Sequence, residues 1–281
     1  MKTLKTILIL CFAICVATSC KKTVDMTLVQ KTVFENADIR QINVDDAWPA
    51  TIVYDSAQTF VELEYSAYLE PYIRVRMEDQ NLEIGFTGKV YAEVGSVFRV
   101  TIHTNRLEKL SIEEAAIVDC QQNAGVFSGR HLDIEMSKAS RCSSLAFSGE
   151  SCEIRMEDAS VLAGFRFAGN SCVAILEDVS QFNGELSAAE SIEIQLSDAS
   201  RFVGEGGITD RACIKMTEAS LLNMAEIQVT SMEVELSEGS EATVHVTDLL
   251  SGSLKEASTL FYKGSPIVDV ECLSGSSIIP F

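Results

Sequence analysis

The chain has 281 residues, and its 22 basic and 41 acidic side chains give a formal net charge of −19. This balance argues against nucleic acid as a partner, because a phosphate backbone requires a basic face. It also argues against electrostatic adhesion to anionic lipid, so membrane attachment would need an acyl chain. The length allows one or two domains.

Residues 1–20 have the pattern of a signal peptide: two lysines, an apolar stretch over residues 7–16, and small residues directly before Cys20. The apolar stretch is too short for a stable membrane span. Two interpretations stay open here. Ala17 and Ser19 suit an ordinary signal peptidase. A Cys at position 20 resembles the lipobox of bacterial lipoproteins, although Ala17 stands where such motifs usually carry Leu.

We favour the lipobox and predict acylation of Cys20, with a tether over residues 21–33. The protein would then be an exported outer-membrane lipoprotein on the periplasmic or the cell-surface face. Cleavage removes Lys2 and Lys5, which leaves 20 basic against 41 acidic residues and a net charge of −21.

Residues 34–105 contain short stretches that alternate or are rich in β-branched residues, which indicates strands. They cover residues 39–44, 50–54, 60–65, 73–77, 82–86 and 98–103. A hairpin turn is expected at residues 78–81, and a single helical turn at residues 66–72. Trp48, the only tryptophan, is expected to cover the end of a core rather than to stack on a sugar.

A phrase that ends in Ser returns every 20 residues in the rest of the chain. It occupies residues 136–140, 156–160, 176–180, 196–200, 216–220 and 236–240, with looser copies at 254–258 and 273–277. A fixed period of this length marks stacked units, each too small to bury its own apolar face. Helical and leucine-rich repeats fit less well, because the required periods or residues are missing.

The residues before each Ser alternate between apolar and polar, as Leu132, Ile134 and Met136 do with their neighbours. This alternation is typical of a strand with one buried face. We therefore predict an all-β fold, a parallel β-helix with rungs of about 20 residues. Residues 34–105 would be its N-terminal β cap, because a solenoid needs its first rung covered. Residues 106–281 would form the regular rungs, the first of them over residues 107–120.

Two columns of like residues are expected along the rod. The Ala before each Ser would face an inward corner too narrow for a larger side chain, and the Ser hydroxyl would bond local backbone or the next Ser. Cys152 and Cys172 lie one repeat apart at an inward position. Of the six cysteines beyond Cys20, none has a partner at zinc-site spacing, so we expect buried free thiols rather than a metal site or a disulfide.

The recurring Leu-Ser-x-Ala-Ser phrase and the ending at residues 262–266 (Tyr-Lys-Gly-Ser-Pro) resemble the GIN-domain family of autotransporter adhesin heads. The resemblance extends from about residue 34 to the C-terminus. It implies a right-handed β-helix on a secreted or lipid-anchored protein of Bacteroidetes-type bacteria, with a role in cell adhesion. It implies no catalytic residues. The position before Ala, typically Gly in the family, is acidic in this chain.

These acidic residues would form a ladder along one edge of the rod. They are Asp158, Asp178, Asp198, Glu218, Glu238 and Glu256. Such a ladder could collect Ca²⁺, a hard ion that prefers several carboxylate oxygens. The favoured interpretation is a solvated acidic edge that discourages sheet aggregation. We predict no other cofactor and no further metal site.

Enzymes exist on parallel β-helices, but their clefts are built from long loops, for which rungs of 20 residues leave no room. His103, His131 and His245 lie in alternating stretches without a recognisable nucleophile. We therefore expect a non-catalytic binding or adhesion module of the cell envelope, with a glycan or a surface protein as ligand. The alternatives are a carbohydrate-active enzyme and a passive structural protein of the envelope.

Overall fold

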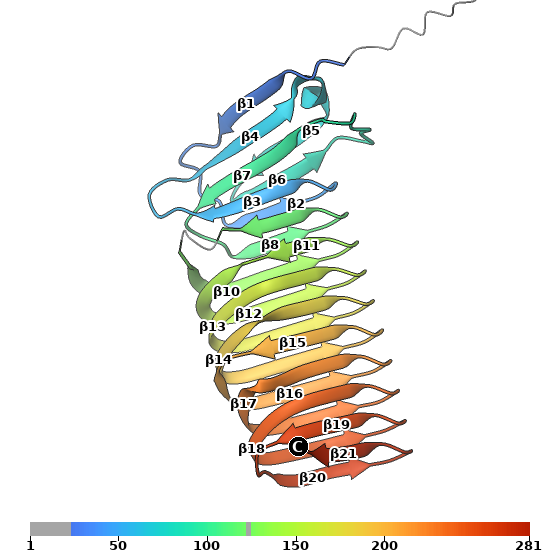
Figure 1. Ribbon diagram of the computed structural model, residues 1–281. Helices are drawn as coiled ribbons and strands as arrows, with labels where there is room; N and C mark the ends of the chain where they lie inside the picture. Colours follow the sequence, from blue (N-terminus) through green and yellow to red (C-terminus); the bar gives the residue numbers. More distant parts are fainter. Residues whose placement is uncertain (1–23, 122–124) are drawn as a thin grey trace, which may run out of the picture.

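The computed structural model describes residues 24–121 and 125–281. The predicted signal peptide and Cys20 lie outside the described residues. The protein is 65% strand and 2% helix, and the strands form a solenoid of about eight turns with rungs of roughly 20 residues. Figure 1 shows them stacked into a rod, with the N-terminal strands at one end and the C-terminus at the other. The predicted fold class is confirmed.

The rod is built from short strands that follow one another around each rung. They are β8 (Lys109–Ile112), β9 (Ile117–Cys120), β10 (Phe127–Met136), β11 (Arg141–Ser143), β12 (Ala146–Met156), β13 (Val161–Leu176), β14 (Gln181–Leu196), β15 (Arg201–Glu205), β16 (Ile208–Met216), β17 (Leu221–Leu236), β18 (Glu241–Leu254), β19 (Thr259–Lys263), β20 (Ile267–Cys272) and β21 (Ser277–Pro280). Pairing between successive rungs is parallel, and Leu132 lies opposite Cys152, which lies opposite Cys172. Equal positions are thus stacked about 4.8 Å apart.

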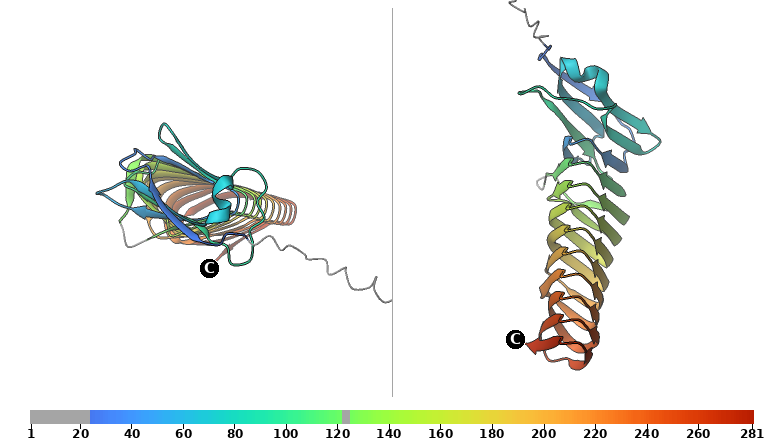
Figure 2. Two further views of the ribbon diagram at one scale, coloured as in Figure 1. Left: turned by 90° about the horizontal axis from the view of Figure 1, so that it is seen from above. Right: turned by 90° about the vertical axis from the view of Figure 1, so that its right-hand side faces the viewer.

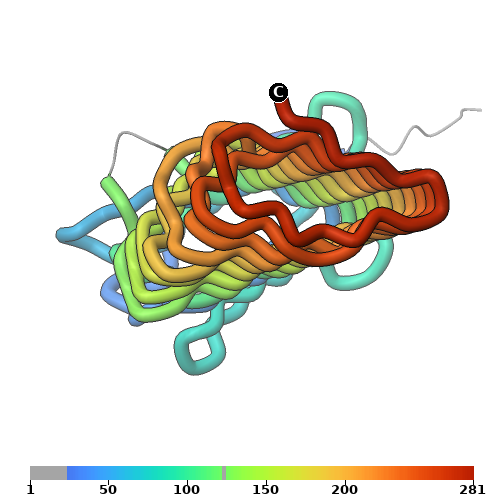
Figure 3. Tube along the Cα trace, turned by 90° about the horizontal axis from the view of Figure 1, so that it is seen from below, coloured from blue at the N-terminus to red at the C-terminus, as the bar shows by residue number. Residues whose placement is uncertain are grey.

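The alternation seen in the sequence separates core from surface as predicted. Leu132, Ile134 and Met136 are buried, and the buried apolar side chains of all rungs form a single continuous cluster. Aromatic rings stack within it, and the centroids of Phe182 and Phe202 are 4.4 Å apart. Seen along its axis, the rod is flattened, and the turns of successive rungs overlie one another at one narrow edge (Figures 2 and 3).

The repeated phrase forms the β-turn at this narrow edge. In the turn from Glu157 to Ser160, the two central residues have positive φ, 53° at Asp158 and 60° at Ala159. The N–H of Ser160 donates to the carbonyl of Glu157 at 3.3 Å. Two positive φ angles with this hydrogen bond are characteristic of a type I′ turn, whose twist matches that of the flanking strands.

The predicted inward position of the Ala residues is wrong. Ala159 and its equivalents are exposed at the tip of the turn, while Ser160 and its equivalents are the side chains that enter the core. The Ala position selects a small residue because its backbone is left-handed, and that conformation accommodates a small side chain better than a branched one. The Ser prediction is confirmed for part of the column: the hydroxyl of Ser160 donates to the Glu157 carbonyl at 2.6 Å and lies 3.4 Å from that of Ser140. The buried hydroxyls of Ser180 and Ser200 have no hydrogen-bond partner among the described residues.

The N-terminal part contains the strands β1 (Leu28–Val33), β2 (Gln41–Val44), β3 (Pro49–Tyr54), β4 (Phe60–Ser66), β5 (Ile73–Glu78), β6 (Asn81–Phe86) and β7 (Phe98–Thr104), with the 3₁₀ helix η1 (Ala67–Tyr72). The helical turn and the hairpin at residues 78–81 are confirmed. Residues 28–33 were assigned to the tether, but they form β1, which pairs antiparallel with β4.

Regular rungs begin earlier than residue 107. β2 and β3 pair in parallel with β8 and β9, and they are joined by the same turn, with positive φ at Asp46 and Ala47. Trp48 occupies the position that Ser holds in later rungs. It is completely buried and packs against Phe86 and Phe98, as expected of a residue that closes the core.

The chain visits these first rungs out of order. β6 and β7 come later in the sequence than β2 and β3, yet they pair on the opposite side of them, so the rung at residues 41–54 lies between the strands of residues 81–104 and those of residues 109–120. β5 and β4 then extend the two sides of the rod antiparallel. This crossover brings segments about 68 residues apart side by side, as Gln41 lies opposite Lys109.

Candidate functional site

The six carboxylates predicted to form a ladder do lie in one column on the narrow edge. Each is the second residue of its turn, and for the first five the N–H of the following residue donates to the carbonyl of the next ladder residue. Ala159 bonds Asp178 in this way at 2.7 Å, and Ala199 bonds Glu218 at 2.8 Å. The backbone therefore fixes the carboxylates one above another along the rod.

The column is longer than predicted, and its charge is not uniform. Glu114 and Lys138 hold the same turn position in the earlier rungs, and the Lys138 ammonium lies 3.0 Å from the Glu114 carboxylate. This hydrogen bond raises the pKa of Lys138. Further along, the hydrogen bond and the charge of Asp198 raise the pKa of Glu218. Repulsion between neighbouring carboxylates is therefore felt within the ladder.

Within the described residues, three carboxylates approach one another at metal-binding distance in one place, and it lies outside the predicted six. Asp45, Asp46 and Glu114 have ligand atoms within 4.8 Å of one another. The Arg74 guanidinium already lies 3.2 Å from Asp45 and 3.8 Å from Asp46. The Phe86 N–H also donates to Asp46 at 2.6 Å. A cation would have to displace Arg74, and calcium binding by the ladder stays a prediction.

A polar hollow of about 500 Å³ lies on the flat face beside this cluster, where the first rungs meet. Its lining comes from β2, β5, β6, β8, β10 and the adjoining turns: Gln41, Asn43, Val44, Asp45, Arg74, Glu83, Ile84, Lys109, Ser111, Glu113 and Glu135. The registers place Glu83, Asn43, Ser111 and Glu135 in one outward row across four strands. Short side chains in the middle of this row and longer ones at its ends produce the depression.

Two cations and four carboxylates line this hollow. The Lys109 ammonium lies 2.6 Å from Glu135 and 3.3 Å from Asp133. Burial lowers the pKa of Lys109, but the bonds and charges of these two acids outweigh it and raise the pKa. The same hydrogen bond from Lys109 lowers the pKa of Glu135. Arg74 has a buried Nε without a hydrogen-bond partner among the described residues.

Neither the alternation nor the repeats predicted this hollow. Its residues are ordinary outward polar positions of strands, and they come together because the chain crosses between rungs. One signal was available: residues 44–48 (Val-Asp-Asp-Ala-Trp) match the repeated phrase except at the last position. Recognising this match would have placed β2 in the solenoid and next to later rungs.

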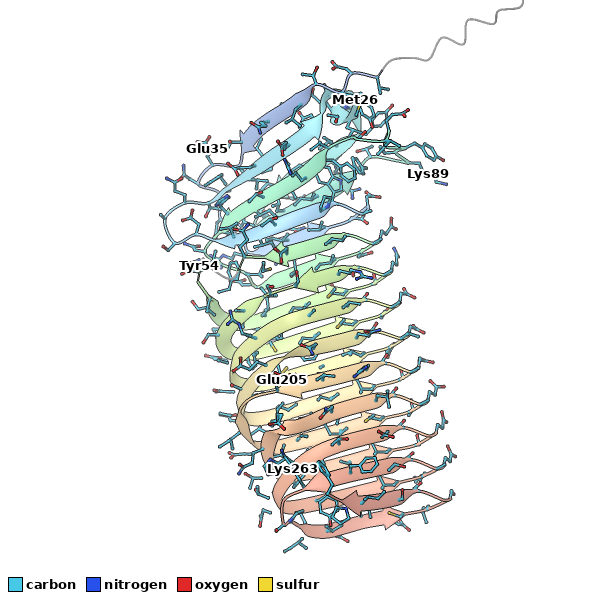
Figure 4. The ribbon with its side chains drawn as sticks, viewed as in Figure 1. Met26, Glu35, Tyr54, Lys89, Glu205 and Lys263 are labelled. Atoms are coloured by element: carbon cyan, nitrogen blue, oxygen red, sulfur yellow. The ribbon has the colours of Figure 1, made fainter. Side chains whose placement is uncertain are left out.

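The three histidines lie in separate environments. His103 stacks on Phe60 at 4.1 Å and lies 3.7 Å from both Asp55 and Glu62. The pKa of His245 is lowered, mainly by burial and further by the positive charge of nearby Lys263, which is labelled in Figure 4.

His131 is exposed on β10, and its Nδ1 lies 2.8 Å from the Ser151 hydroxyl. No carboxylate in the described part of the chain lies within 4 Å of its ring. A serine nucleophile requires a histidine base that is itself oriented by a third group. Among the described residues, this pair has no carboxylate in the position of that third group.

A comparison with protein families matches residues 39–266 to the family described as "Putative auto-transporter adhesin, head GIN domain". The chain belongs to this family. Its GIN domain therefore includes the rung of β2 and β3 as well as the later ones. A search of curated proteins finds no match.

Solved structures resemble this GIN domain over most of its length. A putative adhesin from Parabacteroides merdae is 16% identical with a TM-score of 0.64, covering 92% of this chain and 98% of the other. A putative adhesin from Parabacteroides distasonis is 17% identical with a TM-score of 0.63 over the same shares. A putative lipid binding protein from the same species is 13% identical with a TM-score of 0.62, covering 91% and 97%. At these identities the likeness shows the fold.

The family and these neighbours suggest a surface or envelope protein that acts as a binding module. Among residues 24–121 and 125–281, no helix is long and apolar enough to cross a membrane.

Proposed function

We propose that this protein is a non-catalytic binding module of the cell envelope that takes a glycan in the hollow between Arg74 and Lys109. The hollow carries the proposal. At about 500 Å³ it has the size of a small-molecule site, and its lining offers carboxylates, amides, a hydroxyl and two cations. Sugar hydroxyls both donate and accept hydrogen bonds, so they match a lining that mixes acceptors with donors.

The charges favour one class of glycan. Four carboxylates face two cations around the hollow, which leaves an excess of negative charge. An acidic sugar would be repelled, whereas a neutral or amine-bearing sugar would not. The lining is mostly polar, so an acyl chain, the ligand suggested by the description of one structural neighbour, would find little apolar contact there.

Attachment to the outer membrane through acylated Cys20 completes the proposal. The lipid would hold the N-terminal end of the rod, and with it the hollow, near the membrane. Metabolic labelling with a clickable fatty acid tests this part, because replacing Cys20 with Ala should abolish the label. A label that persists in that variant would contradict the anchor.

A glycan array with the mature protein, run with and without Ca²⁺, tests binding, and assaying the bound glycans for cleavage tests catalysis. Saturable binding without turnover is the expected result. Asn43→Tyr should abolish it by filling the hollow. Gln195→Tyr is the matched control, because Gln195 occupies the same outward row five rungs further along. Cleavage would favour the enzyme alternative, and silence on a broad array would favour a structural role or a protein partner.

A further inference from the structure

Two buried cysteines of neighbouring rungs touch inside the rod. Cys152 and Cys172 are directly opposite each other in the parallel pair of β12 and β13, and both face the core with 2% and 1% of their surface exposed. Their sulfur atoms are 3.2 Å apart. The pair is flanked in this column by Leu132 on one side and Ile192 on the other, so each thiol has only the other thiol as a sulfur neighbour in the column.

Both thiols are free in the structure, as the sequence led us to expect. Because they touch, we nevertheless propose that Cys152 and Cys172 are a site of covalent modification, where oxidation forms a disulfide that links two successive rungs from within the core. Neighbouring strands lie about 4.8 Å apart, and Cα atoms joined by a disulfide are usually about 4.4–6.8 Å apart. The backbone therefore already has the required separation. The sulfur atoms must approach by a further ~1.2 Å, from 3.2 Å to about 2.05 Å.

The reaction is thiol–disulfide exchange with a small or protein disulfide as oxidant. One thiolate attacks the oxidant and releases its first thiol, and the second cysteine attacks the resulting mixed disulfide and releases the other thiol. The two cysteines together lose two protons and two electrons, and the oxidant is reduced to two thiols. An exported protein meets such oxidants as it folds.

Burial determines when the bond forms. The neighbouring thiol and burial raise the pKa of Cys152 well above its ordinary value, so little thiolate exists in the finished rod. The bond therefore forms while β12 and β13 come together, and the closed core then shields it from reductants. Cys213 and Cys272, which are half-buried and exposed, lack this protection.

The test uses the mature chain carrying Cys213→Ser and Cys272→Ser, refolded from reductant and denaturant in a mixture of reduced and oxidised glutathione. After free thiols are alkylated, peptide mass spectrometry should find Cys152 linked to Cys172, with a mass lower by two hydrogen atoms. The link should survive reductant in the folded protein and disappear when urea is added. Adding Cys172→Ala, a small apolar replacement for a buried thiol, should leave Cys152 alkylated. Recovery of both cysteines as alkylated thiols after refolding would overturn the proposal.

Discussion

One turn of the rod carries a residue that its backbone conformation disfavours. Val179 holds the position taken by Ala in most turns, with φ at 65°, and it is 52% exposed. A left-handed conformation costs a residue with a side chain roughly 1–2 kcal/mol, and a β-branched residue tolerates it worst. Because the side chain is exposed, little burial compensates for this strain.

Val179→Gly should therefore stabilise the protein. Glycine adopts positive φ freely, so the substitution recovers the strain of roughly 1–2 kcal/mol. It adds about 0.5–1 kcal/mol of chain entropy to the unfolded state. The net gain in the free energy of unfolding is about 0.5–1 kcal/mol. Equilibrium urea unfolding followed by circular dichroism measures it as a higher midpoint.

Val173→Gly is the matched control within the same rung. Val173 faces outward from β13, where the backbone is extended. Glycine there should lower stability by about 0.5–1 kcal/mol. If Val179→Gly were neutral, or as destabilising as Val173→Gly, the account of the turn as a left-handed pair that selects small residues would be refuted.

Three further changes test other parts of the structure. The Ser220 hydroxyl donates to a backbone carbonyl at 2.7 Å, whereas the buried Ser200 hydroxyl has no partner among the described residues. In urea unfolding, Ser220→Ala should lower the free energy of unfolding by about 1 kcal/mol, and Ser200→Ala should raise it; equal effects would contradict this assignment. Asp198 raises the pKa of Glu218 above its ordinary value, so the folded state binds the Glu218 proton more tightly than the unfolded chain and loses stability as the pH rises through the raised pKa. Glu218→Gln should reduce this loss in melting temperatures measured across pH, and an unchanged pH profile would contradict the coupling of the two carboxylates. Phe281 donates its N–H back to the preceding rung, so an N–H at Pro280 would face the side of β21 that pairs with no other described strand. Pro280→Thr should increase self-association in light scattering, and a variant as monodisperse as wild type would refute edge protection.

The rungs were predictable because stacking imposes one physical requirement on every repeat. Each strand must bury alternate residues against the same core, so the apolar column that contains Ile134 and Ile154 recurs at a constant interval. The same reasoning failed at Ala159, because an exposed left-handed position and a narrow inward corner both select a small residue. Only the backbone angle distinguishes the two cases.

The candidate site was not predictable for a different reason. The hollow forms where β2 pairs with β6 on one side and with β8 on the other, and both of these strands come much later in the chain than β2. Pairing between strands so far apart in the chain produces no regular period in the sequence. The one local signal, the match of residues 44–48 to the repeated phrase, was obscured because Trp48 replaces the Ser. The acidic ladder, by contrast, lies within consecutive repeats, so the sequence alone placed its six carboxylates in one column.

Hydrogen–deuterium exchange of the mature protein with the tightest glycan from the array tests the central claim most directly. If the hollow binds the glycan, protection should concentrate in peptides covering residues 41–45 and 109–113 and disappear in Asn43→Tyr, while Gln195→Tyr keeps it. Protection confined to the later rungs, or retained in Asn43→Tyr, would contradict the assignment of the binding site.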